Sequence, residues 1–418
     1  MVVACSDSAS DDTDGGADGG TVDLPDPILE EPPLLCHVEM TCAEEIIDDP
    51  KKPCQMKIMD GDNQVEYDGM VGVELRGRSS RDFPKPQYGI ELWADNSGNT
   101  KLSESLFGMG GDPDWILNGA YVDRSFIRNK LLFDMYQGLG GNERYTVENV
   151  YCDLSFNDDP RGIYILSEKI KVDDDRLDLA IDETQTGQSF LLKQGDQFSS
   201  KQGIKPVGVA NGDWILVSPK QDEATAAEIQ GISTFLDAFN ESIQNPNSSS
   251  SVFDFLDLSS AVDFYLLEEF AKNVDAYHLS MHIWKEPGGK IHFIPWDFDL
   301  AFGQPEYSEG FLSEGLSVTS SALIQHLRAN DEFRGALASR WQELRQGTWS
   351  QENIFKRIDF YLETIGPFVD SNFERWPIED IVFLNDPDNL YPITDHADEI
   401  TKIKTWIEAR LNWLDSEF

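Results

Sequence analysis

Basic residues are scarce in this chain of 418 residues, which carries 33 Lys and Arg against 76 Asp and Glu and a formal net charge of −43. Binding to a phosphate backbone needs clustered Lys and Arg, so the deficit argues against a nucleic acid partner. An acidic excess of this size is typical of a solvated surface that keeps a protein soluble. It is also compatible with attraction of divalent cations or basic partners.

Long hydrophobic runs are missing as well. No stretch of roughly 18 or more apolar residues occurs, so the sequence predicts no membrane-spanning helix. The hydrophobic fraction is nevertheless 40%, with 11% aromatic residues. That is enough apolar surface for a packed core and excludes a globally disordered chain.

Cysteine is rare, and none of the five cysteines forms a Cys-x-x-Cys pair, which argues against a zinc site. Cys5 follows the small and aliphatic residues 1–4, a pattern typical of the end of a bacterial lipoprotein signal. Residues 6–33 are rich in Ser, Asp, Gly and Pro and predict a disordered tether. We therefore expect an exported lipoprotein of the cell surface or periplasm, anchored to the membrane only through Cys5. The alternative is an accidental cysteine near a disordered terminus.

The other four cysteines are Cys36, Cys42, Cys54 and Cys152. In an exported chain they suggest up to two disulfides with three possible connectivities, and in a cytosolic chain they would be free buried thiols. Three of the four lie close together at the start of the body. We expect them to staple that segment.

The body predicts an α+β fold with strands in its first half and helices in its second. Alternating apolar positions predict one hairpin from 71–77 and 88–94 and another from 147–157 and 161–170, with further strands at 189–195 and 213–219. Helical periodicity becomes dominant near residue 222. Ser125 is expected to cap a helix that ends at the glycines from 138 onward. We expect an N-lobe over about 34–220 and a C-lobe over about 221–418, with a cleft between them.

The stretch 268–303 is the most informative for chemistry. Asp275 follows a predicted helix, and a predicted hairpin at 279–295 leads to Asp297 and Asp299. The hairpin is expected to bring Asp275 close to Asp297. Phosphoryl transfer needs a carboxylate to accept the hydroxyl proton and oxygen ligands for a divalent metal, and this order of groups is found in protein kinases. The plainer interpretation is a turn in which an Asp caps a helix or binds a backbone amide.

Four spaced motifs resemble the spore-coat protein H (CotH) kinase-like family across roughly residues 55–380. They are, in order, VELRGRSSRDFPKPQYGIEL, DWILNGAYVDRSFIRNKLLFDM, RGIYILSEKIKVDDDRLDL and KNVDAYHLSMHIWKEPGGKIHFIPWDFDLAFG. The resemblance implies an atypical two-lobed protein-kinase-like fold, with ATP and Mg²⁺ or Mn²⁺ as cofactors. It further implies that hydroxyl groups of surface or coat proteins receive the ATP γ-phosphate.

The resemblance also implies roles for individual residues. Asp275 would be the catalytic Asp, Asp297 the main metal ligand, and Asp299 and Ser280 further metal contacts. The candidate nucleotide-binding residues are Lys85, Arg76, Ser79, Arg128, Glu168 and Trp296. Glu168 would pair with Lys85 or lie near the adenine. Ordinary roles compete with several of these: Lys85 as a surface lysine, Arg128 in an ion pair, Glu168 as a surface charge beside Lys169, and Trp296 as a core aromatic.

One departure from the kinase pattern concerns Ser280, which stands five positions after Asp275, where a kinase catalytic loop supplies Asn. His278 and His282 flank it and offer ligands for a transition metal instead. The sequence also lacks a Gly-x-Gly-x-x-Gly loop, so any phosphate clamp must come from residues 76–85. These departures leave two other functions open: an inactive kinase-fold module for surface binding or adhesion, and a metal-dependent hydrolase.

Overall fold

The computed structural model of the protein describes residues 35–140, 144–180, 189–195, 214–220, 222–245, 248–305, 307–381 and 393–418, without the side chains of Ser79 and Tyr307. The predicted tether over 6–33 and the predicted anchor on Cys5 lie outside these residues. No helix in the described part of the chain is long and apolar enough to cross a membrane.

Alternating apolar residues in the first half of the described chain form a closed barrel. Its strands pair in the order β1, β2, β3, β4, β5, β7, β6, and β6 pairs with β1 in parallel. The strands are β1 (Cys36–Cys42), β2 (Lys52–Met59), β3 (Val65–Arg76), β4 (Gln87–Trp93), β5 (Asp114–Asn118), β6 (Asn149–Phe156) and β7 (Asp159–Glu168). The predicted hairpins correspond to β3 with β4 and β6 with β7, and both are confirmed as antiparallel pairs.

Strand β1, which the sequence pattern did not reveal, closes the barrel. It pairs with β2 on one side and β6 on the other, and a disulfide joins it to each neighbour: Cys42–Cys54 and Cys36–Cys152. One bridge thus stays within the first segment of the body, as expected. The other crosses 116 positions to β6 and fixes the barrel closure covalently.

A second sheet follows the barrel, with strands in the order β11, β10, β8, β9. These strands are β8 (Phe190–Gln194), β9 (Trp214–Ser218), β10 (Met281–Lys285) and β11 (His292–Pro295). All four fall where the apolar runs predicted strands. The hairpin of β10 and β11 is antiparallel, with Met281 opposite Pro295.

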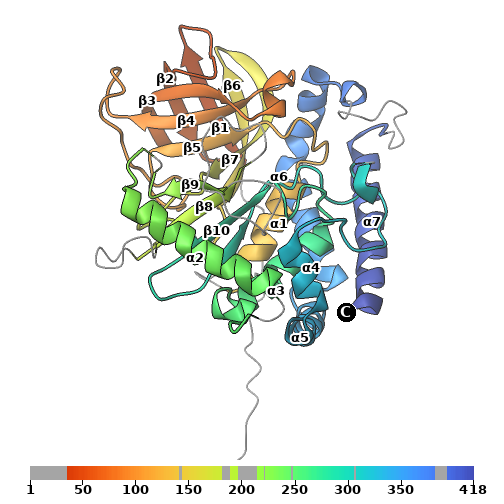
Figure 1. Ribbon diagram of the computed structural model, residues 1–418. Helices are drawn as coiled ribbons and strands as arrows, with labels where there is room; N and C mark the ends of the chain where they lie inside the picture. The colour runs from red at the N-terminus through yellow and green to blue at the C-terminus, as the bar shows by residue number, and fades with distance from the viewer. Residues whose placement is uncertain are drawn as a thin grey trace, which may run out of the picture. The chain divides into compact units, whose positions relative to one another are not determined.

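The second half of the chain is mainly helical, as Figure 1 shows in green to blue. One helix, α1 (Arg128–Gln137), lies in the first half. The others are α2 (Ala226–Gln244), α3 (Leu258–Ala271), α4 (Ala322–Ala329), α5 (Asp331–Gln346), α6 (Gln351–Arg375) and α7 (His396–Glu417). Short 3-10 segments are η1 (Ser79–Asp82), η3 (Val252–Asp254), η4 (Tyr307–Glu309) and η5 (Ile378–Asp380). The α+β class, with strand-rich N-terminal sheets and a helical C-terminal part, is therefore confirmed. The lobe boundaries stay a prediction.

The start of α1 differs from the expected cap at Ser125. The helix begins at Arg128, and its N-cap residue Ile127 makes no side-chain capping bond. The carboxylate of Asp123 accepts a hydrogen bond from the Arg128 backbone N–H (3.0 Å), and the Ser125 hydroxyl accepts one from the Ile127 N–H (3.1 Å). The predicted cap lies two positions too early, because Asp123, with two carboxylate oxygens, competes for the first free N–H of the helix.

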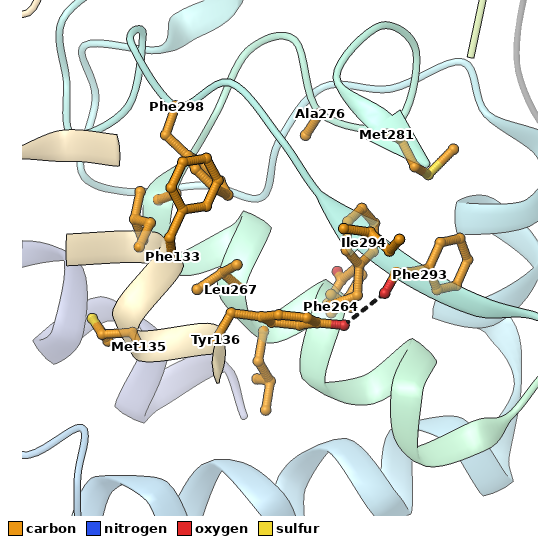
Figure 2. Packing of buried hydrophobic residues seen from close by; sticks show 14 of the residues in the cluster. Phe133, Met135, Tyr136, Phe264, Leu267, Ala276, Met281, Phe293, Ile294 and Phe298 are labelled. Atoms are coloured by element: carbon orange, nitrogen blue, oxygen red, sulfur yellow. Dashed lines mark hydrogen bonds between the residues drawn. The ribbon is translucent and has the colours of Figure 1, made fainter. Parts of the chain in front are cut away.

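A buried hydrophobic cluster joins α1, α3 and the β10–β11 hairpin, and it includes Ala276 and Phe298 (Figure 2). Tyr136 of α1 packs in this cluster and donates a hydrogen bond to the Phe293 carbonyl of β11 (3.0 Å). Phe298 is fully buried beside Phe133, with ring centroids 5.7 Å apart. Because Phe298 lies between Asp297 and Asp299 in sequence, its burial fixes the turn that carries both carboxylates.

Candidate active site

The loop after α3 is tied to the turn after β11 by one side chain, that of Asn273. Helix α3 ends at Ala271, and its C-cap residue Lys272 has a left-handed backbone with φ 45°. The Asn273 side-chain oxygen accepts a hydrogen bond from the Asp275 N–H (3.2 Å), and its amide nitrogen donates to the Asp297 carbonyl (3.2 Å). The structure therefore brings Asp275 and Asp297 together, although they lie 22 positions apart in the sequence.

Asp297 occupies a left-handed backbone conformation with φ 63°, which is uncommon for a residue with a Cβ. Its side chain stays accessible to solvent, yet the protein packed around it and the nearby Asp275 carboxylate raise its pKa to about 6. Arg76 acts in the opposite direction. A strained residue that carries a carboxyl group with a raised pKa is typical of a functional site.

Asp299 lies deeper in the site and is held by α1. Its carboxylate accepts a hydrogen bond from the Asn129 amide, and the oxygen of that amide accepts one from the Phe298 N–H (2.9 Å). Burial, followed by the charges of Asp297 and Asp123, raises the Asp299 pKa well above its usual range. Asn129 thus clamps the turn between the two carboxylates from the opposite helix.

Asp275 is half-buried, and burial raises its pKa, while His278 acts to lower it. Glu268 of α3 is fully buried, and burial together with Glu269 and Asp275 raises its pKa well above the usual range. Several acidic groups therefore crowd around Asp297. Such crowding favours a bound cation, because carboxylates without positive partners repel one another.

The oxygen donors at this centre fit a divalent metal. Among the described residues, no three His, Cys, Asp or Glu side chains converge as a ready-made metal cage. Mg²⁺ seldom uses such a cage, since it is bound by one or two carboxylates together with substrate phosphates. Asp297 and Asp299 would supply the carboxylates. The two histidines offered by the sequence as transition-metal ligands have other neighbours. His278 is half-buried and within hydrogen-bonding distance of the Ala276 carbonyl (3.0 Å), and His282 packs beside Trp296.

Arg76 is the predicted nucleotide-binding residue that the structure brings to the carboxylates. It ends β3, is half-buried, and donates a hydrogen bond to the Gln87 side chain of β4 (3.4 Å). Burial lowers its pKa, whereas Asp297 and Asp299 raise it, which places its charge beside theirs. Ser79 belongs to η1 just beyond it, but its side chain lies outside the described part.

Lys85 lies elsewhere. Its side chain is buried, and its amine donates hydrogen bonds to the Ile163 carbonyl of β7 (2.5 Å) and the Asn372 side chain of α6 (2.8 Å). The amine also lies over the rings of Phe126 and Tyr164. Burial lowers the Lys85 pKa well below its usual range. These partners tie the barrel to α6, and none of them is a site carboxylate.

Replacing Lys85 by Met tests which role holds. If Lys85 joins β7 to α6, the Ile163 carbonyl and the Asn372 side chain lose their partner, and unfolding free energy falls by about 1–3 kcal/mol. The KM for ATP would then stay unchanged. Urea unfolding and initial-rate kinetics measure both quantities, with the exposed Lys220→Met as the matched control. A stable variant whose KM for ATP rises tenfold would instead support the nucleotide-binding role.

Glu168 and Arg128 are also engaged in partnerships of their own. Glu168 is buried, accepts backbone hydrogen bonds from Gly110 (2.9 Å) and Glu148 (3.1 Å), and has Arg176 rather than Lys85 as its cationic neighbour. It lines a cavity of about 940 Å³ whose walls include Trp284 and none of the three site aspartates.

Arg128 is fully buried in an ion-paired network. Its guanidinium contacts Asp123 (2.7 Å) and Glu399 of α7 (2.8 Å), and it donates to the Ala301 carbonyl (2.8 Å). Arg128 therefore supports the segment after Asp299 from behind. It does not face an open surface.

Two remaining candidates flank the site. Trp296 is half-buried, packed between Phe133 and His282 with ring centroids 5.8 and 6.3 Å away. Ser280 is buried, and its N–H reaches the Asp275 carbonyl at 3.5 Å. Sequence reasoning missed Asn129, Asn273 and Glu268. Asn273 was within reach, because it stands two positions before Asp275 in the Asn-x-Asp motif.

Comparison with known proteins identifies the family that this chain matches. The family model described as CotH kinase protein matches residues 73–414, which is most of the chain and includes all three site aspartates. The chain belongs to the CotH kinase family. A curated relative, the inner spore coat protein H of Bacillus subtilis (strain 168), is 22% identical over 341 residues, covering 78% of this chain and 83% of the relative. Among solved structures, the Golgi casein kinase aligns with a TM-score of 0.26 and 10% identity, covering 93% of this chain and 75% of that one.

The raised pKa of Asp297 predicts that the stability of this CotH chain depends on pH. Between the unfolded-state value of about 3.9 and the folded value of about 6, the folded state binds more protons, so stability falls as pH rises through that window. In chelator, Asp297→Asn should therefore raise the melting temperature most at pH 8 and by only about half as much at pH 5, in the middle of the window. Scanning calorimetry of both proteins, with the exposed Asp370→Asn as control, measures the difference. A variant less stable than the parent at pH 8 would contradict the assignment.

Proposed function

We propose that this CotH family member is a metal-dependent protein kinase that acts outside the cytoplasm. The observation that carries the proposal is the tie between Asp275 and Asp297 through Asn273, together with the charge of Arg76 beside Asp297 and Asp299. A base, a metal-binding carboxylate and a cation for developing phosphate charge are the groups that phosphoryl transfer needs.

In the proposed reaction, an acceptor hydroxyl attacks the γ-phosphorus of ATP while the bond to the bridging oxygen of ADP breaks. Asp275 takes the proton that the hydroxyl loses, and ADP leaves. Asp297 and Asp299 would hold the divalent metal, which neutralises phosphate charge when bound. Arg76 would stabilise the charge on the transferring group. Phe298 and Asn129 keep both carboxylates in place.

The proposed location rests on the two disulfides, Cys36–Cys152 and Cys42–Cys54. Structural disulfides are characteristic of extracytoplasmic proteins, since reducing compartments disfavour them. With the lipoprotein-like residues 1–5, they support display at the cell surface or periplasm. Acceptors would be surface or coat proteins, in keeping with the spore-coat relative.

The experiment is transfer of label from γ-labelled ATP by the full chain, in Mg²⁺ or Mn²⁺, to a mixture of peptides with Ser, Thr or Tyr. Mass spectrometry locates the product. Label should appear with the parent and with Asp370→Asn, and should be lost with Asp275→Asn. Free phosphate released without acceptor would favour the metal-dependent hydrolase. The absence of both ATP binding and transfer would favour a surface-binding module and make Ser280 the first residue to replace by Asn.

A further inference from the structure

The segment after Asp299 displays large apolar side chains to solvent. Phe311 is 48% exposed, Leu312 41% and Val318 61%. Leu279, four positions after Asp275, is 36% exposed. Single exposed apolar residues need no explanation, but a group in two segments beside a candidate site does. In the described part of the chain, the other large apolar side chains with comparable exposure are Ile47 and Val65, near the barrel.

The backbone of this segment, residues 311–318 and here termed the pinned loop, is held from beneath. Its carbonyls accept hydrogen bonds from side chains at the end of α3 and on α7. The bonds run from Trp406 to Phe311 (3.0 Å), from Lys272 to Leu312 (2.9 Å), and from Arg410 to Ser313 (2.9 Å) and Gly315 (2.7 Å). The Ser317 N–H donates to Glu269 of α3 (2.8 Å). The exposed side chains are therefore presented by a fixed backbone.

The pinned loop lies against the candidate catalytic loop. Lys272, which holds it, caps α3 three positions before Asp275. Gly310 precedes the loop and is close to Val274, since a methyl group added at Gly310 would meet a Val274 methyl at 2.7 Å. On the other side of Asp275, the Leu279 N–H donates to the Asp275 carbonyl (3.1 Å). One exposed apolar residue, Leu279, thus follows Asp275 in its own loop, and the others belong to a loop that packs against Lys272 and Val274 just before Asp275.

We propose that the pinned loop and Leu279 form the docking surface for the acceptor polypeptide. The surface selects a segment with a large apolar side chain a few residues from the hydroxyl that receives the phosphoryl group. This inference rests on the proposed kinase function, because the occupant is the acceptor. The position of the surface determines the occupant. The pinned loop packs against Lys272 and Val274, within three positions of Asp275, so a segment that delivers its hydroxyl to Asp275 comes close to the pinned loop.

A fixed apolar surface improves binding in two ways. Burying a large apolar side chain strengthens binding by roughly tenfold or more. A backbone already held in place loses little freedom on binding, so more of that gain is retained. A peptide with an amide in place of the apolar side chain would forfeit the gain from apolar burial.

The test uses paired peptides of equal net charge with one Ser, in which each flanking position in turn carries Phe or Asn. The proteins are the full chain, its Phe311→Ser/Leu312→Ser variant and the control Val65→Ser, whose side chain is 55% exposed on β3. Transfer gives kcat/KM. Fluorescence anisotropy with Asp275→Asn forms of all three, Mg²⁺ and a non-hydrolysable ATP analogue gives Kd without chemistry.

The expected result is a preference of roughly tenfold or more for Phe at one or two flanking positions. It should vanish in the double variant and persist in Val65→Ser, while the KM for ATP stays unchanged. A parent without preference, or a preference that survives in the double variant, overturns the docking proposal even if phosphorylation occurs. If the anisotropy preference appears and is lost as expected but no peptide is phosphorylated, the docking surface stands and the kinase function fails.

Discussion

Asp275→Asn is expected to lower the rate of phosphoryl transfer by about 10²–10⁴-fold, the usual contribution of a positioned general base. Asn keeps the size of the side chain and the Asn273 contact to the residue-275 backbone, but it cannot accept the hydroxyl proton. Folding and nucleotide affinity should change little. Single-turnover transfer and an ATP-binding titration measure the two effects separately.

The comparison with Asp297→Asn makes this result specific. Asp297 is assigned to metal binding, so its replacement should weaken metal-dependent ATP affinity as well as transfer. If Asp275→Asn lost ATP affinity and kept its transfer rate at saturating ATP, the roles of the two aspartates would have to be exchanged. The exposed Asp370→Asn on α6 controls for the loss of one negative charge.

Arg128→Met is expected to give the largest loss of stability, about 3–5 kcal/mol, because it strands buried carboxylates without their shared cation. Asp123 and Glu399 both contact the Arg128 guanidinium and are themselves fully buried in the network. Urea unfolding, monitored by circular dichroism, measures the loss. Removing the charge of one of these carboxylates as well, in the double variant Arg128→Met/Glu399→Gln, should recover part of the lost stability.

The recovery of stability in the double variant shows whether Arg128 supports the fold through buried ion pairs or contacts the nucleotide. A direct nucleotide role for Arg128 predicts a small change in stability and a large rise in the KM for ATP. If Arg128 instead supports the fold through buried ion pairs, stability falls strongly and the KM for ATP changes little. Any kinetic effect would then arise from movement of Ala301 and of Asp299, two positions before it. Additive losses in the double variant would contradict a shared network.

Local patterns were sufficient to predict much of the fold. The hairpins β3–β4, β6–β7 and β10–β11 follow from alternating apolar residues bounded by turns, and α3, α5 and α7 follow from helical periodicity. The barrel closure did not follow. Strand β1 pairs in parallel with β6 more than a hundred positions away, and no local signal indicates a parallel partner.

The candidate site divides in the same way. Asp275, Asp297 and Asp299 stand out because a hairpin links them, and a hairpin is a local feature. The surroundings of Lys85 depend on Asn372, which is 287 positions away on α6, and those of Arg128 depend on Glu399 of α7. Neither partner is visible from spacing. Residues whose role depends on distant helices were therefore the ones for which sequence offered only family resemblance.

Thermal unfolding of the full chain with ATP, with and without Mg²⁺ or Mn²⁺, beside Asp297→Asn, tests the metal-dependent nucleotide site most directly. Ligand at about 100 times its dissociation constant adds about 2.7 kcal/mol to stability, which shifts the melting temperature by several degrees or less in a chain of this size. The account predicts a shift in the parent that requires both metal and ATP and is absent in Asp297→Asn. No shift in the parent with either metal, or an equal shift in the variant, would contradict it.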